Sequence, residues 1–225
     1  MASRRTFLIR SAAGLGGCGL AAAAGGCNIA GGLFVLASGP PKIPAAFEPD
    51  SARPTVILID DLNSVVPRSA LRDRIGSVAE RILLEREVFD EGAMISAASA
   101  RRAALAGSAE QRLSVVDIGR MVGAEVVIWV LMTGWSLSTE PGAVSPAASA
   151  QVCLIDTLAN ERVWPPGERK FPLLEELPRD VRGDVPTSIA ARREIEEQLA
   201  TRFGRALAQM FFEHERERLS EQLRG

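Results

Sequence analysis

The first 38 residues constrain this chain more than any other segment, because they have the pattern of an export signal rather than of a folded element. Arg4 and Arg5 precede an apolar stretch, and no charged residue occurs from Ser11 to Pro41. A basic start followed by an apolar region and small residues is typical of a segment that directs a chain out of the cytoplasm. We therefore expect the remaining residues to fold and act outside the cytoplasm.

Ser3 to Leu8 (SRRTFL) resembles the twin-arginine export signal, in which a receptor reads the paired Arg4 and Arg5. The glycine- and alanine-rich region that follows is only weakly hydrophobic, which suits that route. The general secretory route is the alternative.

Two cysteines in this segment are candidates for lipid attachment. Cys18 comes three residues after Leu15, as in a lipobox. The apolar region before it, from Ser11 to Gly17, has only seven residues, which is short for an export signal. Cys27 leaves sixteen residues from Ser11 to Gly26, so we favour Cys27 and predict that residues 1–27 are a signal peptide with a lipobox. Two or three acyl chains on the cysteine would hold the chain firmly, since each buried methylene contributes about 0.8 kcal/mol.

An uncleaved transmembrane helix is the alternative to the lipid anchor. Residues 11–38 are long enough to cross a bilayer of about 30 Å, and the apolar patch from Ile29 to Leu36 favours this interpretation. The many Gly and Ala residues oppose it, because they contribute little to insertion. With the lipid on Cys27, the protein is expected on a bacterial membrane, facing the periplasm.

Charge and composition argue against several classes of function. The formal net charge of −2 implies no attraction to nucleic acid. Cys153 lies in an apolar segment and is expected to be a buried thiol, whereas the single histidine, His214, stands among charged residues near the end. We therefore expect no catalytic residues, no metal site, no cofactor apart from the lipid, and no enzymatic activity.

Apolar periodicity and proline content divide the chain after the signal. We predict an apolar and then proline-rich tether over residues 28–54, a single α/β domain over residues 55–212, and a charged helical tail over residues 213–225. The tail is either solvated or a docking helix for another protein.

Within the domain, a continuous or alternating apolar pattern predicts strands and a 3.6-residue period predicts helices. The strands are expected at residues 55–59, 94–96, 124–131 with an extension toward Trp135, 148–155 and 162–164, and the helices at residues 69–82, 97–106, 114–123 and 188–223. Residues 165–187 contain five prolines and are expected to form a surface loop. This order predicts a mixed α/β fold, with a sheet of four to five strands and packed helices.

Three segments resemble a group of periplasmic lipoprotein domains. Thr55 to Asp61 leads into an amphipathic helix, Ile118 to Glu125 (IGRMVGAE) precedes a strand, and Val152 to Thr157 (VCLIDT) leads through a turn to Arg162-Val163-Trp164. Similar motifs recur in this order in the curli-secretion channel lipoprotein, the activator lipoproteins of penicillin-binding proteins and the amino-terminal domain of the TolB protein. The resemblance covers about residues 54–215 and implies an α/β fold in the cell envelope. It does not extend to pore formation, because no amphipathic hairpin corresponds to those of the curli channel.

Asp60, Asp61 and Trp135 are the candidate contacts for a ligand or partner. The two acids follow the first strand, at the strand end where open α/β sheets often bind ligands. Trp135 stands beside Ser136 and Ser138, which suggests that water is near and that the indole is an anchor for a partner.

Our main hypothesis is a non-enzymatic envelope lipoprotein that binds another envelope protein or a second copy of itself. The alternative is a ligand-binding or transport-accessory lipoprotein with a pocket near Asp60 and Asp61. A concave apolar pocket at the strand ends would favour the alternative, and a flat apolar patch would favour the main hypothesis.

Overall fold

Segments rich in β-branched and aliphatic residues form the central sheet, as their continuous or alternating apolar pattern predicts. The computed structural model describes residues 42–107, 112–137, 145–167, 169–177 and 188–215. The chain divides into two units, residues 1–40 and residues 41–225, and every described element belongs to the second. The export segment lies outside the described residues, so Arg4, Arg5, Cys18 and Cys27 stay predictions.

The main sheet has six strands in the order β3-β2-β4-β5-β6, with β7 also paired to β5. Its strands are β2 (Thr55–Asp60), β3 (Met94–Ile95), β4 (Val126–Ser136), β5 (Ala147–Asp156), β6 (Glu161–Trp164) and β7 (Phe171–Glu176). β2 runs parallel to β3 and β4, and the remaining pairs are antiparallel. The mixed α/β fold is confirmed, with more strands than the four to five expected.

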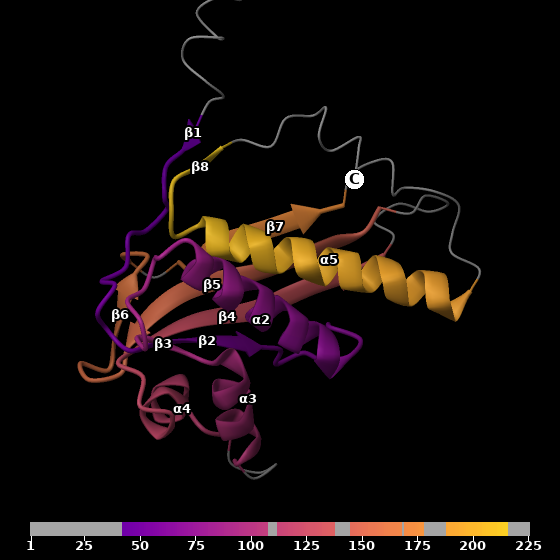
Figure 1. Cartoon of the computed structure of the whole chain (residues 1–225). Helices are drawn as coiled ribbons and strands as arrows, with labels where there is room; N and C mark the ends of the chain where they lie inside the picture. The colour runs from indigo at the N-terminus through magenta and orange to yellow at the C-terminus, as the bar shows by residue number, and fades with distance from the viewer. Residues whose placement is uncertain (1–41, 108–111, 138–144, 168, 178–187, 216–225) are drawn as a thin grey trace, which may run out of the picture. The chain divides into compact units, whose positions relative to one another are not determined.

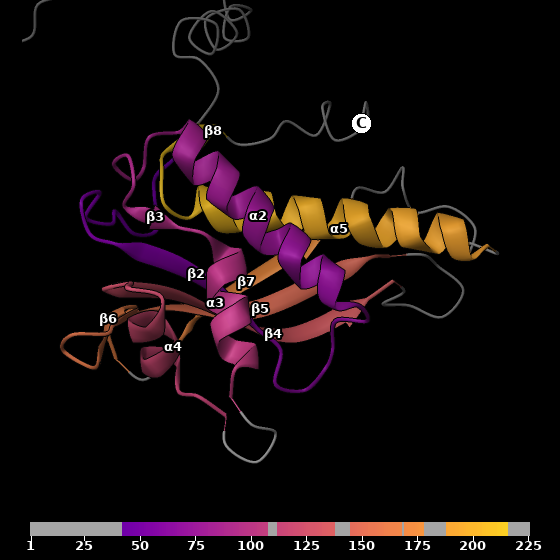
Figure 2. The same ribbon diagram turned by 60° about the horizontal axis from the view of Figure 1, so that its bottom comes forward.

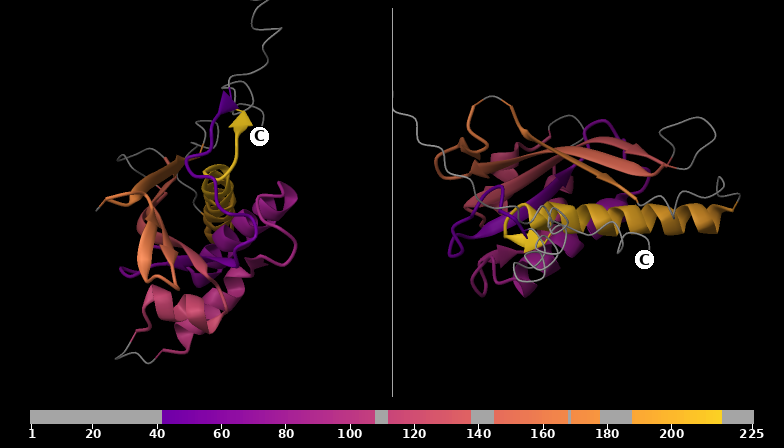
Figure 3. Two further views of the ribbon diagram at one scale, coloured as in Figure 1. Left: turned by 90° about the vertical axis from the view of Figure 1, so that its left-hand side faces the viewer. Right: turned by 90° about the horizontal axis from the view of Figure 1, so that it is seen from above.

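Helices cover the two faces of the sheet unequally. α2 (Ser69–Glu85) and α5 (Ile189–Gln209) pack together on one face, over the larger apolar core. α3 (Ala97–Leu105) and α4 (Val115–Met121) cover part of the other face, near β2 and β4. Figures 1 and 2 show the two helix pairs on opposite sides of the sheet, and Figure 3 shows α5 lying over β5 and β7.

β7 lies in the segment that was expected to be a surface loop, so that prediction is wrong for residues 171–176. β7 pairs with β5 from Val152↔Phe171 to Ala147↔Glu176. Pro172 cannot donate to a ladder, but proline is tolerated on an outer strand, where its nitrogen faces away from the neighbour. Phe171 stacks at 4.9 Å between ring centroids on Trp164, which binds the strand to the core.

The long terminal helix ends earlier than the sequence predicts, and the start of the expected helical tail is a strand. α5 stops at Gln209, and β8 (His214–Glu215) pairs antiparallel with β1 (Lys42–Ile43). Met210 and Phe211 are buried, so the chain turns into the core instead of continuing as an exposed helix. The rest of the tail, residues 216–225, lies outside the described residues.

The described part of the expected tether packs against the domain. The Phe47 ring lies 5.9 Å from that of Trp164, and the backbone N–H of Ala46 donates to the Met210 carbonyl at 2.8 Å. Arg53 donates to Glu125 and Asp156 at 3.2 and 2.8 Å. Residues 42–49 contain no helix, as their prolines predict, and residues 50–53 form a turn. The segment is therefore part of the domain surface and not a free linker.

The residues at the ends of α4 and in the β5–β6 turn suit their conformations. The Ser114 side chain accepts a hydrogen bond from the backbone N–H of Asp117 at the start of α4. Gly123 has a φ of 77° just beyond the end of this helix, and Asn160 has a φ of 58° in the turn between β5 and β6. Gly and Asn are the residues that adopt this left-handed conformation most readily.

Candidate functional site

A groove between α2 and α3 is a prominent concave feature of the described residues. We call it the α2–α3 groove. Its floor is β2 from Ile57 to Asp60. Its two walls are residues 70–80 of α2 and residues 96–105, which comprise α3 and the residue before it, and residues 112–118 close one end. Its volume is about 480 Å³, within the range of ligand sites in proteins.

The groove exists because β3 is much shorter than β2. β3 pairs only with Thr55 and Val56, and the chain then leaves the sheet at Ser96 to begin α3. At the base of the groove, α2 and α3 approach closely, since a Cβ on Gly76 would lie 3.0 Å from the Cβ of Ala97. The later residues of β2 are therefore flanked by helices but not by a strand on this side, within the described part of the chain.

Asp60 lines the groove, as the sequence suggested for a ligand contact, but its carboxylate already has two protein partners. Trp129 donates from Nε1 to Oδ2 at 3.2 Å, and Arg112 donates from Nη2 to Oδ1 at 3.4 Å. The Arg112 side chain is 63% exposed, so this ion pair is open to solvent and contributes little energy. Asp60 thus fixes the indole of Trp129 and leaves Arg112 available to exchange partners.

Asp61 has a structural role in the loop after β2. Its carboxylate is buried and accepts hydrogen bonds from the backbone N–H groups of Val65 and Val66, at 2.8 and 3.0 Å. These bonds close the turn that leads into α2. Asp61 is not among the residues that line the groove, so the two neighbouring acids have separate environments.

Most charged groups of the groove are engaged in contacts that hold its walls. Arg101 of α3 pairs with Asp73 of α2 across the groove. Glu80 of α2 accepts a hydrogen bond from the backbone N–H of Ala97 at 2.9 Å and thereby caps α3. These side chains link the two helices and set the width of the groove.

Arg72 is the exception among the charged side chains of the groove. It lines the cavity, and its Nε atom is buried without a hydrogen-bond partner in the described structure. A buried N–H that is left unpaired costs roughly 1–3 kcal/mol, and more when the group is charged. An acceptor from a bound molecule would remove this cost.

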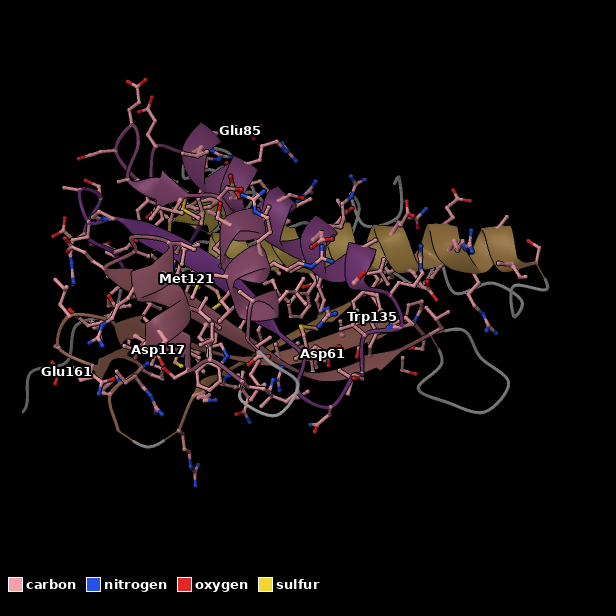
Figure 4. All side chains as sticks on the ribbon, turned by 90° about the horizontal axis from the view of Figure 1, so that it is seen from below. Asp61, Glu85, Asp117, Met121, Trp135 and Glu161 are labelled. Carbon is pink, nitrogen blue, oxygen red and sulfur yellow. The ribbon has the colours of Figure 1, made fainter. Side chains whose placement is uncertain are left out.

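Trp135 lies at the same end of the sheet as Asp61, as Figure 4 shows, because β4 runs parallel to β2 and continues beyond Asp60. The indole packs on the larger core and is only partly exposed. Its Nε1 is buried with no hydrogen-bond partner in the described structure. The structure therefore places Trp135 outside the α2–α3 groove, and its expected role as a partner contact stays a prediction.

A second polar cluster lies on the sheet face that carries α3 and α4. The Lys170 ammonium sits 3.5 Å from the centroid of the Trp129 ring, and Trp129 pairs across the sheet with Cys153. Burial lowers the pKa of Lys170, and it raises the pKa of the fully buried Cys153 thiol. The buried Cys153 agrees with the sequence-based expectation.

Within the described ranges, no three His, Cys, Asp or Glu side chains lie where they could hold a metal ion together. Among the helices that the structure describes, none is both long enough and apolar enough to cross a bilayer. The candidate helix over residues 11–38 lies outside those ranges.

The fold and the groove define a mixed α/β domain with a helix-flanked strand edge. No family model matches the sequence, and no curated protein does. Solved structures with similarity include the PelC dodecamer from Paraburkholderia phytofirmans, at 10% identity and a TM-score of 0.38, covering 76% of this chain and 94% of that chain. Lipoprotein GNA1162 from Neisseria meningitidis matches at 14% identity and a TM-score of 0.37, covering 63% and 90% of the two chains.

The LpoB C-terminal domain from Salmonella enterica matches at 18% identity and a TM-score of 0.31, covering 56% of this chain and 83% of that chain. The three matches thus lie at 10–18% identity and at TM-scores of 0.31–0.38. Their low identities and TM-scores carry no argument about function, so membership of a particular group within the expected resemblance stays a prediction.

The sequence-based alternative placed a pocket near Asp60 and Asp61, and the groove is lined by Asp60 but not by Asp61. Its two helical walls were not predicted. The groove depends on β3 being only two residues long, and the sequence around Met94-Ile95 does not show where this strand ends. Arg72 was not singled out, because on a helix of alternating charge it is indistinguishable by pattern from Arg74 and Arg81. Its buried Nε depends on how α2 and α3 approach each other.

Proposed function

We propose that this chain is a membrane-anchored lipoprotein of the bacterial envelope, and that its α/β domain binds another envelope protein on the periplasmic side without catalysing a reaction. The export segment with Cys27 supports the location. The similarity in fold to lipoproteins of other bacteria is compatible with it.

The concavity of the α2–α3 groove by itself favours a ligand site, so the observation that carries the proposal is the open edge of β2 inside it. Strand edges are sites where proteins pair with another chain, and folded proteins usually protect them. Here two helices flank the edge but leave a cavity of about 480 Å³ in front of it. A site of this shape offers both main-chain hydrogen bonds and apolar side-chain contacts to a protein partner.

Purification of the tagged full-length protein from detergent-solubilised membranes tests the proposal. We expect one protein partner at constant stoichiometry, and we expect Ser77→Trp, which fills the groove from an exposed position on α2, to reduce its recovery. Arg81→Trp, on the solvent side of the same helix, is the matched control because its side chain is exposed and lies outside the groove. Recovery of the protein alone, with the membranes intact before extraction, contradicts the proposal.

The anchor is tested separately with a fatty-acid analogue. Cys27→Ala is expected to abolish metabolic labelling and to release the protein from the membrane, whereas Cys18→Ala leaves both unchanged. The reverse pattern would move the attachment site to Cys18. Labelling of neither wild type nor variant would favour the helix over residues 11–38.

A small-molecule site is the second candidate function. The specific observation that favours it is the concave, largely apolar cavity at the end of β2, beside Asp60. Native mass spectrometry of the protein purified from cells tests it. A bound small molecule that is lost in Ser77→Trp and retained in Arg81→Trp would support the ligand-binding function over the protein-binding one.

A further inference from the structure

We infer that the α2–α3 groove binds an extended peptide segment, which adds as a strand to the free edge of β2 and places an acidic side chain against Arg72. This inference rests on the proposed protein-binding function and specifies the part of the partner that the groove recognises.

The backbone of β2 has no partner strand on the β3 side beyond Val56, within the described residues. The N–H of Thr55 donates to the Ala93 carbonyl at 2.8 Å, so the main-chain groups of Thr55 face the β3 side. Because backbone direction alternates along a strand, Ile57 and Ile59 present their main-chain groups to this same side. The pairing with β3 ends at Val56, and the described chain supplies no further strand there. The edge at Ile59 is therefore open to an added strand.

The groove extends along the second half of β2. All four residues from Ile57 to Asp60 line the groove, although their side chains alternate between the two faces of the sheet, so the cavity reaches the strand edge itself. Four residues of strand span about 13 Å. The groove thus accepts a short extended segment, and main-chain hydrogen bonds to such an edge do not depend on the sequence of the added strand.

The acidic side chains of the groove already have partners within the protein. Asp60, Asp73 and Glu80 are already engaged with Arg112, Arg101 and the start of α3 respectively. Arg72 has a buried, unpaired Nε, and the ion pair of Arg112 is exposed. The groove therefore favours a negatively charged hydrogen-bond acceptor. A carboxylate side chain of the peptide is such an acceptor, and its geometry matches that of a guanidinium.

The two sides of the groove differ, and this difference sets the alternation of the peptide. α2 contributes the unpaired Nε of Arg72. The α3 side contributes the apolar side chains of Ala104, Leu105 and Leu113, together with Arg101 and Arg112, which are already paired with Asp73 and Asp60. Successive side chains of an added strand point to opposite faces. The preferred segment therefore alternates acidic and apolar residues, with the acidic side chains toward α2.

Panning a phage-displayed library of random dodecapeptides against the detergent-purified full-length protein tests this inference. We expect enrichment of segments in which acidic and apolar residues alternate. A synthetic peptide of the enriched sequence should bind about tenfold more weakly to Arg72→Gln than to wild type, as loss of one charged hydrogen bond predicts. Arg81→Gln is the control, since Arg81 pairs with Glu85 outside the groove, and it should leave the Kd unchanged.

Amide hydrogen exchange at single-residue resolution identifies the binding mode. The Ile59 amide should exchange freely in the unbound protein and become protected when the peptide binds. The Leu58 amide faces β4 and should be protected in both states, so it is the internal control. A helical or side-chain-only mode of binding would leave the exchange of Ile59 unchanged.

Failure of the inference and failure of the proposed function give different results. Absence of enriched peptides, equal binding to Arg72→Gln, or unchanged Ile59 exchange overturns strand addition, even when a membrane partner co-purifies with the protein. Absence of any co-purifying protein partner overturns the proposed function instead. Enrichment of alternating peptides together with protection of Ile59 supports strand addition in the groove.

Discussion

Arg68 donates from both Nε and Nη2 to the same carboxylate oxygen of Glu196, at 3.0 and 2.8 Å. This pair joins the residue before α2 to the middle of α5, two segments that are far apart in the sequence. Glu196 is only 7% exposed, which is unusual for a glutamate on a helix. Because burial removes the carboxylate from water, the guanidinium is what makes this position tolerable for a charge.

Removal of Arg68 is therefore expected to destabilise the domain more than loss of an ordinary surface ion pair. Arg68→Ala leaves Glu196 buried and unpaired, and we expect the free energy of unfolding to fall by about 1–3 kcal/mol. This is less than the roughly 3–5 kcal/mol lost when a fully buried pair is broken, because Arg68 is partly exposed. Urea unfolding of wild type and variant measures the difference. Arg68→Ala combined with Glu196→Leu should recover most of it, and failure of the double variant to recover would contradict the role of the unpaired charge.

The crossing of α2 and α5 depends on Gly204. A Cβ at this position would lie 2.7 Å from the backbone carbonyl oxygen of Ile75 and 3.0 Å from Cβ of Val78. Since backbone atoms cannot move aside without displacing the helix, we expect Gly204→Ala to destabilise the domain by about 1–3 kcal/mol, despite the higher helix propensity of Ala. Thermal unfolding measures this change. Gln198→Ala, at an exposed position of the same helix, is the control and should change the stability little.

The sequence predicts the strands whose pattern is local and fails for the strand that depends on distant contacts. β2, β4 and β5 were identified because their apolar runs reflect burial on both faces or alternation, which are local properties of the chain. β7 was missed because Pro172 and two charged residues gave its segment the appearance of a loop. Its strand conformation comes from pairing with β5 and from Phe171 on Trp164, which are contacts between distant segments.

The candidate site was predictable only in part for the same reason. Asp60 at the end of the first strand could be selected from the sequence, and it lines the groove. The different environment of Asp61 depends on the backbone N–H groups of Val65 and Val66, which a sequence does not position. Arg72 became notable only because two helices that are separate in sequence bury its Nε.

The thiol of Cys153 is expected to be unreactive in the folded protein. Its side chain is 0% exposed, and burial raises its pKa, so both access and thiolate content are low. N-ethylmaleimide at pH 7.5 followed by mass spectrometry of the peptide that contains Cys153 measures the labelling. We expect labelling in urea but not in buffer. Labelling at similar rates under both conditions would show that the β4–β5 region opens readily.

Asp156 makes the stability of the domain depend on pH in the acidic range. Its pKa is held below the ordinary value by the backbone N–H of Ala159, then by the Arg53 side chain, and further by the backbone N–H of Leu158. A carboxyl group with a lowered pKa in the folded state stabilises the fold above its unfolded pKa of about 3.9. That contribution is lost as the pH falls through the lower, folded pKa.

Asp156→Asn separates the charge from the turn that Asp156 closes. The Asn side-chain oxygen still accepts from the N–H groups of Leu158 and Ala159, whereas the ion pair with Arg53 is removed. We expect the variant to be less stable than wild type by about 1 kcal/mol at pH 7, and the difference to shrink steadily below pH 4. Urea unfolding of both proteins between pH 3 and pH 7 measures it. A difference that stays constant over this range would mean that the amide disturbs the turn, and that the charge of Asp156 contributes nothing to the stability.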